Sequence, residues 1–289
     1  MAPDIGKMES PMDYESYFAA ELTQIERALD LALPTSSAYA SDLIEAMRYG
    51  VIPGGKRIRP LVVLCVTQAL GGDYSQALFP ATALELLHCY TLIHDDLPCM
   101  DDDAIRRGQP TVHVKFGEAT ALLAGDALLT LAFEQASYAP RAPARIVRLL
   151  AEAAGAKGVI AGQVEDLRAG VCSSVSEDVL TFIHTNKTAE LFRAAAGMGA
   201  YAAGKGEDEN LIRDLMQFGV ALGMAFQYVD DLLDARTESA FSSVSVLGVD
   251  KVQTLAHAYT DQALGALTAF GESAEPLRVL TRLMLKRGT

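Results

Sequence analysis

The chain has 289 residues, of which 50% are hydrophobic, and a formal net charge of −13 at pH 7. So acidic a protein is a poor ligand for nucleic acids or anionic membranes, because both carry charge of the same sign. No apolar stretch is long enough to span a bilayer, and residues 1–10 lack the basic and apolar segments of an export signal, so we expect a cytoplasmic protein without stable membrane insertion.

Long helices are predicted along most of the chain. Ala, Leu and Glu dominate its composition, β-branched runs are few, and proline is absent from 144 to 275. We expect residues 1–10 to be disordered and 11–289 to form one large all-α domain. Short breaks between its helices are predicted at 53–55, 71–73, 106–110, 139–143 and 203–210.

Residues 211–234 predict the central helix of this domain. Apolar side chains lie on nearly every side of it, which is typical of a helix surrounded by other helices. The Val/Ser alternation at 237–248 resembles a strand, but one short strand would have no partner, so we expect a loop there.

Cysteine usage indicates a reducing compartment. The four cysteines are Cys65, Cys89, Cys99 and Cys172. They show no CxxC pair and no regular spacing, so we expect reduced thiols that act as small buried hydrophobic residues.

A first acidic cluster lies in the stretch LIHDDLPCMDDDAIRRG at 92–108. Asp95 and Asp101 are six residues apart, which an unbroken helix would place on different faces. Pro98 should end the helix between them, because it lacks an N–H and clashes with the preceding turn, so that Asp101 can fold back beside Asp95. Facing carboxylates of this kind suggest Mg²⁺, and Mg²⁺ on one or two carboxylates usually brings a substrate phosphate.

A second acidic cluster, YVDDLLD, ends the central helix. Asp230 and Asp234 are four residues apart and therefore lie on one helical face, at the end where the helix dipole is already negative. A solvated acidic surface would be the ordinary explanation. The acids sit on a strongly apolar helix, however, and this favours a bound cation instead.

Basic residues accompany both clusters. GGKRIRP supplies Lys56, Arg57 and Arg59 after two glycines, and Arg106 and Arg107 follow the first acids. Arginine matches a phosphate with a two-pronged fork and lysine supplies a point charge. The combination predicts a phosphorylated substrate.

These motifs together resemble those of short-chain trans-prenyl diphosphate synthases, such as farnesyl and geranylgeranyl diphosphate synthases. The resemblance runs from about residue 40 to the C-terminus. It includes, in the order of the family, GGKRIRP, HCYTLIHDDLPCMDDDAIRRGQPT, LLAGDALLTLAF, GQVEDL, HTNKTAELFRAA and AFQYVDDLLD. It implies a single helical bundle of the isoprenoid synthase type that acts as a homodimer and joins isopentenyl diphosphate to an allylic diphosphate.

The resemblance also implies roles for individual residues. Mg²⁺, with three ions per active site, would be held on the allylic diphosphate by Asp95, Asp101, Asp230 and Asp234. Isopentenyl diphosphate would be bound by Lys56, Arg59, His88 and Arg107. Arg106 would reach the allylic diphosphate, and the reacting allyl group would be lined by Lys187, Thr188 and Gln227. Gln163 and Asp166 of GQVEDL would touch the metal site through water. The released diphosphate would accept the proton.

The resemblance assigns control of the length of the prenyl product to the helix before the first acidic cluster. By family analogy, Tyr90 and Thr91 form the floor of the tunnel that holds the growing chain. A ring as large as that of Tyr90 favours a C15 product, farnesyl diphosphate, made from dimethylallyl and geranyl diphosphates. Tyr90 as an ordinary core aromatic, with a C20 geranylgeranyl product, is the alternative.

The sequence departs from the family after Asp234. The loop ARTESAFSSVSVLGVDK is shorter than is usual and offers only Arg236 before Lys251, which should already lie in the next helix. A weakly active or non-catalytic subunit of a prenyl synthase is therefore a second hypothesis, although no acid of either cluster is missing.

Two further classes of protein share part of this pattern. A class I terpene cyclase shares an aspartate-rich motif and Mg²⁺ but lacks GGKRIRP. A metal-dependent phosphohydrolase of the HD type is suggested by His88 and by the pair His94-Asp95, but it would leave the second acidic cluster and the paired arginines unexplained. His94 is more simply a core or supporting histidine.

Overall fold

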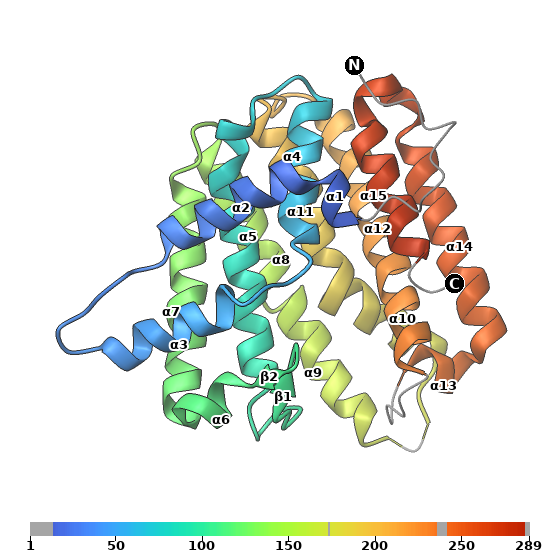
Figure 1. The fold of residues 1–289 in the computed structure, drawn as a ribbon. Coiled ribbons are helices and arrows are strands. Elements are labelled where there is room, and N and C mark those ends of the chain that lie inside the picture. Colours follow the sequence, from blue (N-terminus) through green and yellow to red (C-terminus); the bar gives the residue numbers. More distant parts are fainter. Residues whose placement is uncertain (1–13, 173, 236–241, 287–289) are drawn as a thin grey trace.

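The computed structural model describes residues 14–172, 174–235 and 242–286. The prediction of an all-α fold is confirmed: long helices make up the bundle, with one small hairpin at its edge (Figure 1). The α-helices are α1 (Tyr14–Tyr17), α2 (Ala19–Ala32), α3 (Ser41–Val51), α4 (Ile58–Ala69), α5 (Tyr74–Asp95), α6 (Val112–Phe116), α7 (Glu118–Ser137), α8 (Pro143–Ala154), α9 (Val159–Gly170), α10 (Glu177–Ile183), α11 (Glu190–Ala202), α12 (Glu209–Asp234), α13 (Ser243–Leu247), α14 (Val249–Ala266) and α15 (Glu275–Lys286). The other elements are the antiparallel strands β1 (Ile105–Arg106) and β2 (Gln109–Pro110), the π-helix η2 (His184–Ala189) and the 3₁₀-helix η3 (Thr268–Ala274).

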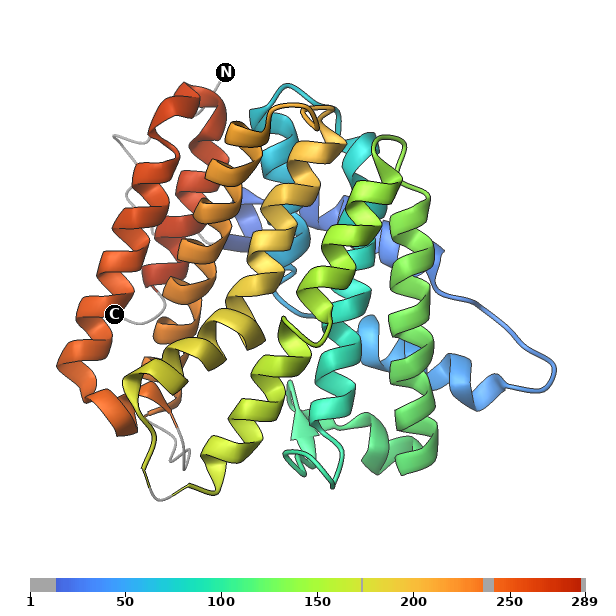
Figure 2. The ribbon, with the colours of Figure 1, turned by 180° about the vertical axis from the view of Figure 1, so that it is seen from behind.

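The predicted central helix is confirmed as α12, which begins two residues before the predicted start and ends at Asp234 as expected. Seen from behind, it lies between α11 and α14 (Figure 2). Glycines let its backbone approach its neighbours: a Cβ on Gly219 would lie 2.4 Å from the carbonyl oxygen of Phe192, and one on Gly223 would lie 2.6 Å from the Cα of Ala189. The core is therefore packed backbone to backbone at this point.

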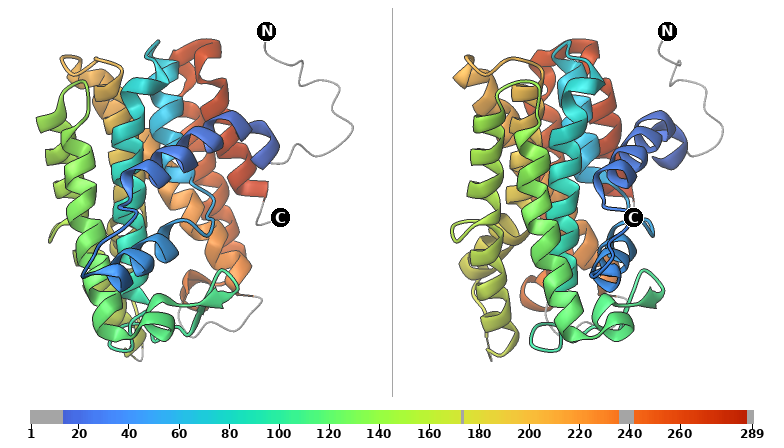
Figure 3. Two further views of the ribbon diagram at one scale, coloured as in Figure 1. Left: turned by 60° about the vertical axis from the view of Figure 1, so that its left-hand side comes forward. Right: turned by 90° about the vertical axis from the view of Figure 1, so that its left-hand side faces the viewer.

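Helices α2 and α3 lie across the outside of the bundle, against α4, α5 and α7 (Figure 3). The carboxyl ends of α5 and α12 lie at one end of the bundle, together with the hairpin and α13 (Figure 1). Both acidic clusters are consequently brought to the same end of the molecule by helices that begin far apart in sequence.

The predicted loop at 237–248 is wrong for its second half, which forms α13. Ser242 caps this helix: its side chain accepts from the backbone N–H of Ser245, whose hydroxyl in turn accepts from the backbone of Ser242. This reciprocal capping outweighs the strand-like alternation. Residues 236–241 lie outside the described residues, as do residues 1–10, for which disorder was predicted, and the domain start at 11.

All four cysteines are free thiols. Cys65 and Cys89 are buried as expected, but the expectation is wrong for Cys99 and Cys172, which are exposed because they lie in the turns after α5 and α9. Within the described ranges, no helix is both long and apolar enough to cross a membrane.

Candidate active site

The first acidic cluster lies where α5 ends. Asp95 is the last residue of the helix, three residues before Pro98. The backbone N–H of Asp101 donates to the carbonyl oxygen of Asp95 over 2.9 Å. The predicted fold-back that places Asp101 beside Asp95 is thus confirmed.

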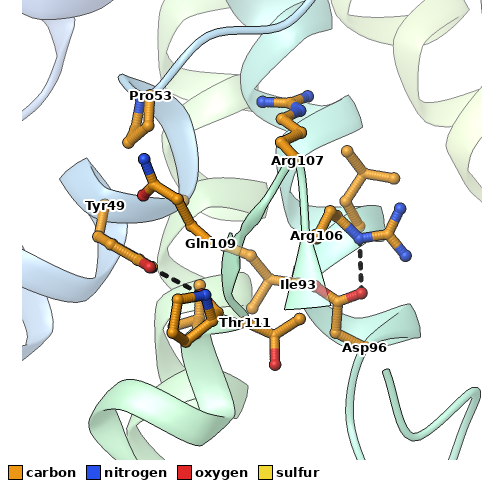
Figure 4. A pocket seen from close by; sticks show the side chains of 12 residues that line it. Tyr49, Pro53, Ile93, Asp96, Arg106, Arg107, Gln109 and Thr111 are labelled. Atoms are coloured by element: carbon orange, nitrogen blue, oxygen red, sulfur yellow. Dashed lines mark hydrogen bonds and ion pairs between the residues drawn. The ribbon is translucent and has the colours of Figure 1, made fainter. Parts of the chain in front are cut away.

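Two acids of this cluster pair with Arg106. Its Nε donates to Oδ1 of the buried Asp96 over 2.6 Å (Figure 4). Its Nη2 donates to Oδ2 of Asp103 over 3.1 Å. Asp96 is therefore engaged by the protein itself, which leaves Asp95 and Asp101 as the paired candidates for a metal ion.

The hairpin brings the two basic motifs together. Arg107 and Gly108 both have positive φ (54° and 74°), as a tight two-residue hairpin turn requires. The Arg107 guanidinium donates to the carbonyl of Gly54, and a Cβ on Gly55 would lie 2.9 Å from Arg107 Nη2. Tyr49 fastens the other strand, because its hydroxyl donates to the Pro110 carbonyl over 2.7 Å (Figure 4). Gly54 and Gly55 have positive φ (81° and 137°), a backbone conformation that other residues rarely adopt.

Arg57, the middle cation of GGKRIRP, is an anchor and does not face the cleft as a free charge. Its guanidinium donates to Glu26 over 2.7 Å and 3.3 Å, to the buried Glu85 over 2.8 Å and to the Val51 carbonyl over 2.6 Å. Burial alone would lower the pKa of Arg57, but Glu85 and Glu26 outweigh it and raise the pKa. A left-handed φ of 47° at Arg57 shows that these bonds hold an unfavourable backbone conformation in place.

A cleft of ≈ 830 Å³ opens beside this loop. All five predicted diphosphate-binding residues line it, together with Asp230 of the second cluster. These six residues are Lys56, Arg59, His88, Arg106, Arg107 and Asp230. The structure therefore gathers cations from two separate segments, together with His88, around one space large enough for a small phosphorylated molecule.

Arg59 is held rigidly at the wall of this cleft. Its guanidinium lies 4.8 Å from the centre of the Phe192 ring, and its Nη1 lies 3.4 Å from Nε2 of His88. Burial, together with the cations Arg59 and Arg107, lowers the pKa of His88 well below its usual value. His88 is therefore neutral and can accept a hydrogen bond from Arg59.

The acids near the end of α5 face a lysine from η2. Lys187 Nζ lies 2.5 Å from Oδ2 of Asp166, and Asp95 and Asp101 also raise its pKa against the effect of burial. Burial raises the pKa of Asp95 to about 6, although Lys187 opposes the shift. Burial raises the pKa of Asp101 as well. Asp166, for which contact with the metal site through water was predicted, is a direct partner of Lys187.

The neighbouring Thr188 reaches α12. Its hydroxyl donates to Gln227 Oε1 over 2.6 Å. Both residues lie in the π-helix η2, from which Lys187 reaches α9 and Thr188 reaches α12. Gly162 of α9 is required here, because a Cβ at this position would lie 2.3 Å from the backbone nitrogen of Lys187.

Tyr90 is buried on the side of α5 that faces α7. Its ring meets that of His94 edge to face, with centres 5.1 Å apart. His94 Nε2 lies 2.9 Å from the carbonyl oxygen of Leu122, as suits a supporting histidine. Thr91 donates its hydroxyl to the His88 carbonyl over 2.8 Å.

The donor set suits a hard cation such as Mg²⁺. Asp95, Asp101, Asp230 and Asp234 offer carboxylate oxygens, which this ion prefers. In the part of the chain that the structure describes, no three His, Cys, Asp or Glu side chains form a ready-made metal site. Mg²⁺ commonly uses one or two carboxylates and completes its shell with water and substrate phosphates.

Two groups of residues around the site were missed by reasoning from the sequence. Glu85 is 2% exposed and pairs with Arg57; a lone Glu inside the apolar run ATALELLHC was an available signal. His184 and Asp231 are also buried and lie 3.4 Å apart, joining η2 to α12. Asp231 lies in the second acidic cluster, but the sequence offers no signal for its pairing with His184, because 47 positions separate the two residues.

Comparison with known proteins agrees with this geometry. The polyprenyl synthetase family model matches residues 41–243. The chain is 41% identical to geranylgeranyl pyrophosphate synthase 11, chloroplastic, of Arabidopsis thaliana, over 96% of this chain and 79% of that protein. An FPP/GFPP synthase from Zymomonas mobilis superposes with a TM-score of 0.88 at 36% identity, covering 94% of this chain and 98% of that one. A geranyltransferase from Helicobacter pylori, solved with magnesium and isoprenyl diphosphate, superposes with a TM-score of 0.85 at 32% identity, covering 96% and 100%.

The chain belongs to the polyprenyl synthetase family. It is a prenyltransferase that condenses prenyl diphosphates.

Proposed function

We propose that this chain is a Mg²⁺-dependent farnesyl diphosphate synthase, which adds isopentenyl diphosphate to dimethylallyl and then to geranyl diphosphate. The observation that carries the proposal is the cleft in which Lys56, Arg59 and Arg107 face Asp230. Its cations match the diphosphate of isopentenyl diphosphate, and its acidic side matches a metal-bound allylic diphosphate.

The chain's own residues divide the work in this proposal. Arg59 is fixed between His88 and Phe192, so it can bind a phosphate without ordering a long side chain on binding. Lys187, paired with Asp166, supplies a positive charge that Asp95 and Asp101 sense at the end of α5. Thr188 and Gln227 present polar atoms to the reacting allyl group.

The acids Asp95, Asp101, Asp230 and Asp234 would hold the metal, with three ions per active site as the family resemblance implies. Magnesium, when bound, stabilises the charge that develops on the departing diphosphate. Arg106 adds to this stabilisation, because its guanidinium lies beside the cleft while Asp96 and Asp103 fix its orientation.

The C15 product rests on Tyr90. Its ring is 8% exposed and is held by His94, so it cannot easily swing away from a chain that reaches it. The geranylgeranyl diphosphate alternative has its own support, which is the 41% identity to a geranylgeranyl pyrophosphate synthase. Product length decides between them.

The second candidate function is that of a weakly active or non-catalytic subunit of a prenyl synthase. Lys251 lies in α14, as predicted, and its Nζ is 2.5 Å from Oε2 of Glu177. It is thus engaged away from the acidic cluster and is a poor replacement for a lysine on the preceding loop. Arg236 lies outside the described residues.

We also propose that the protein acts as a homodimer in the cytoplasm. Leu31 of α2 is 75% exposed, and Leu122 and Leu123 of α7 are 46% and 56% exposed. Apolar side chains in such positions favour contact with a second copy. The free thiols Cys99 and Cys172 suit a reducing compartment.

A product assay tests the proposal. Purified protein is incubated with Mg²⁺, isopentenyl diphosphate and, in separate reactions, dimethylallyl, geranyl or farnesyl diphosphate, and chain lengths are measured by mass spectrometry. A C15 product from the first two primers, without extension of the third, is expected. A C20 product contradicts the role of Tyr90, and no product from any primer favours the subunit hypothesis.

A further inference from the structure

A buried carboxylate lies behind the polar groups that face the reacting allyl group. Asp231 is 7% exposed, although both of its neighbours in the second cluster, Asp230 and Asp234, are more accessible. Its Oδ1 accepts from Nε2 of Gln227 over 2.8 Å. Its Oδ2 accepts from the backbone N–H of Ser243 over 2.9 Å. Asp231 therefore points away from the face shared by its two neighbours.

His184 completes the setting of this carboxylate. Its Nε2 lies 3.4 Å from Oδ2 of Asp231, and its ring packs edge to face on Tyr228 with centres 5.0 Å apart. Three elements, η2, α12 and the start of α13, thus converge on one side chain.

The hydrogen bonds have a direction. Gln227 donates an amide N–H to Asp231, so the amide oxygen of Gln227 turns towards Thr188. The Thr188 hydroxyl donates to this oxygen over 2.6 Å. The Thr188 proton is committed to Gln227, which leaves the hydroxyl oxygen as an acceptor on its open side. Successive hydrogen bonds polarise one another, so the negative charge of Asp231 makes the Thr188 oxygen more negative.

Such a relay suits a reaction through an allylic cation. The C–O bond of the allylic diphosphate breaks, and its electron pair leaves with the diphosphate. The double bond of isopentenyl diphosphate then attacks the allylic cation, and the new cation loses a proton to the released diphosphate. A carboxylate in contact with this cation would capture it as an ester. A carboxylate two hydrogen bonds away lowers the energy of the cation while presenting only a weakly nucleophilic hydroxyl.

We infer that Asp231, held by His184 and Ser243, is a positioning residue that stabilises the allylic cation through Gln227 and Thr188 and binds no metal. The inference rests on the proposed function. It assigns Asp231 a role different from that of Asp230 and Asp234, with which it shares a motif.

The test is Asp231→Asn, which keeps an oxygen acceptor for Gln227 but removes the charge. We expect kcat to fall roughly 10- to 100-fold, less than for the loss of a direct oxyanion donor. The KM of both substrates and the Mg²⁺ concentration for half-maximal rate should stay within about threefold of the wild type. Asp214→Asn, an exposed position on the same helix, is the matched control and should match the wild type.

A double-mutant cycle with Thr188→Val separates the relay from a structural role. Without the Thr188 hydroxyl, the charge of Asp231 can no longer be passed on to the allylic cation. In the Thr188→Val background, Asp231→Asn should therefore lower kcat by less than about threefold. Additive losses would overturn the inference, because they would mean that Asp231 acts independently of Thr188. If Asp231→Asn fails to fold, Gln227→Met breaks the relay at its middle and must show the same lack of additivity.

Other results of the Asp231→Asn experiment would also decide the inference. A raised Mg²⁺ requirement, with activity restored by excess Mg²⁺, would make Asp231 a metal ligand and overturn the inference. An unchanged kcat would do the same. If the wild-type enzyme itself forms no product, the proposed function fails; if it does and only the cycle is additive, the inference alone fails.

Discussion

Replacing Asp95 with Asn should stabilise the protein while abolishing its activity. Burial raises the pKa of this carboxyl group from 3.8 to about 6, so the folded chain holds a charge that it disfavours at neutral pH. Asn resembles the protonated acid in shape and carries no charge. It removes the unfavourable charge and, with it, a candidate ligand for Mg²⁺.

The magnitude follows from the pKa. Each unit of difference between the pKa in the folded state and that in the unfolded state corresponds to about 1.4 kcal/mol. The upper limit on the stabilisation by Asp95→Asn is therefore about 3 kcal/mol. Asp95 is only partly buried in the described structure, so solvent screens part of this energy. We expect the free energy of unfolding to rise by roughly 1–2 kcal/mol at pH 7.5.

The size of this stabilisation depends on pH. Between pH 3.8 and about 6 the folded Asp95 holds its proton more tightly than the unfolded one, so this residue's contribution to stability declines as pH rises through that window. Above about pH 6 the penalty is complete, and below pH 3.8 it vanishes because both states are protonated. The advantage of Asp95→Asn should therefore disappear at low pH.

Urea unfolding of both proteins in EDTA, at pH 7.5 and pH 4, measures this difference directly. Mg²⁺ with an allylic diphosphate should then stabilise the wild type but not the variant, and turnover of the variant should be lost. An equal stability gap at both pH values would refute the electrostatic explanation, and near-normal turnover would refute the metal assignment.

Three further changes test other parts of the structure. Tyr90→Ala should lengthen the product from C15 to C20 or beyond in the mass spectrum, and an unchanged product would show that the ring is only a core residue. Glu85→Gln leaves Arg57 with a weaker partner in a buried site, so urea unfolding should show a loss of about 3 kcal/mol; a loss below about 1 kcal/mol would mean that Glu26 alone satisfies the guanidinium. Gly162→Ala places a Cβ 2.3 Å from the Lys187 nitrogen, so calorimetry should show a lower Tm together with reduced kcat, and an unchanged enzyme would contradict the close contact of α9 with η2.

Much of the fold was predictable because its signals are local. Helix 211–234 follows from its continuous apolar composition, and the end of α5 follows from Pro98 three residues beyond Asp95. Local signals also compete, and the sequence was misread where they did. At α13 the capping serine Ser242 prevailed over a strand-like alternation.

The residue types of the site were determined by the sequence, since carboxylates and arginines in such number imply a metal and a phosphate wherever they meet. Which of them are available was decided by the tertiary structure. Arg57 is paired with Glu26 and Glu85, and Asp96 with Arg106. Lys56 and Arg59, the neighbours of Arg57 in its motif, line the cleft. Neighbours in sequence point in different directions, and their partners come from distant helices, so only packing in three dimensions can divide a motif into anchors and ligands.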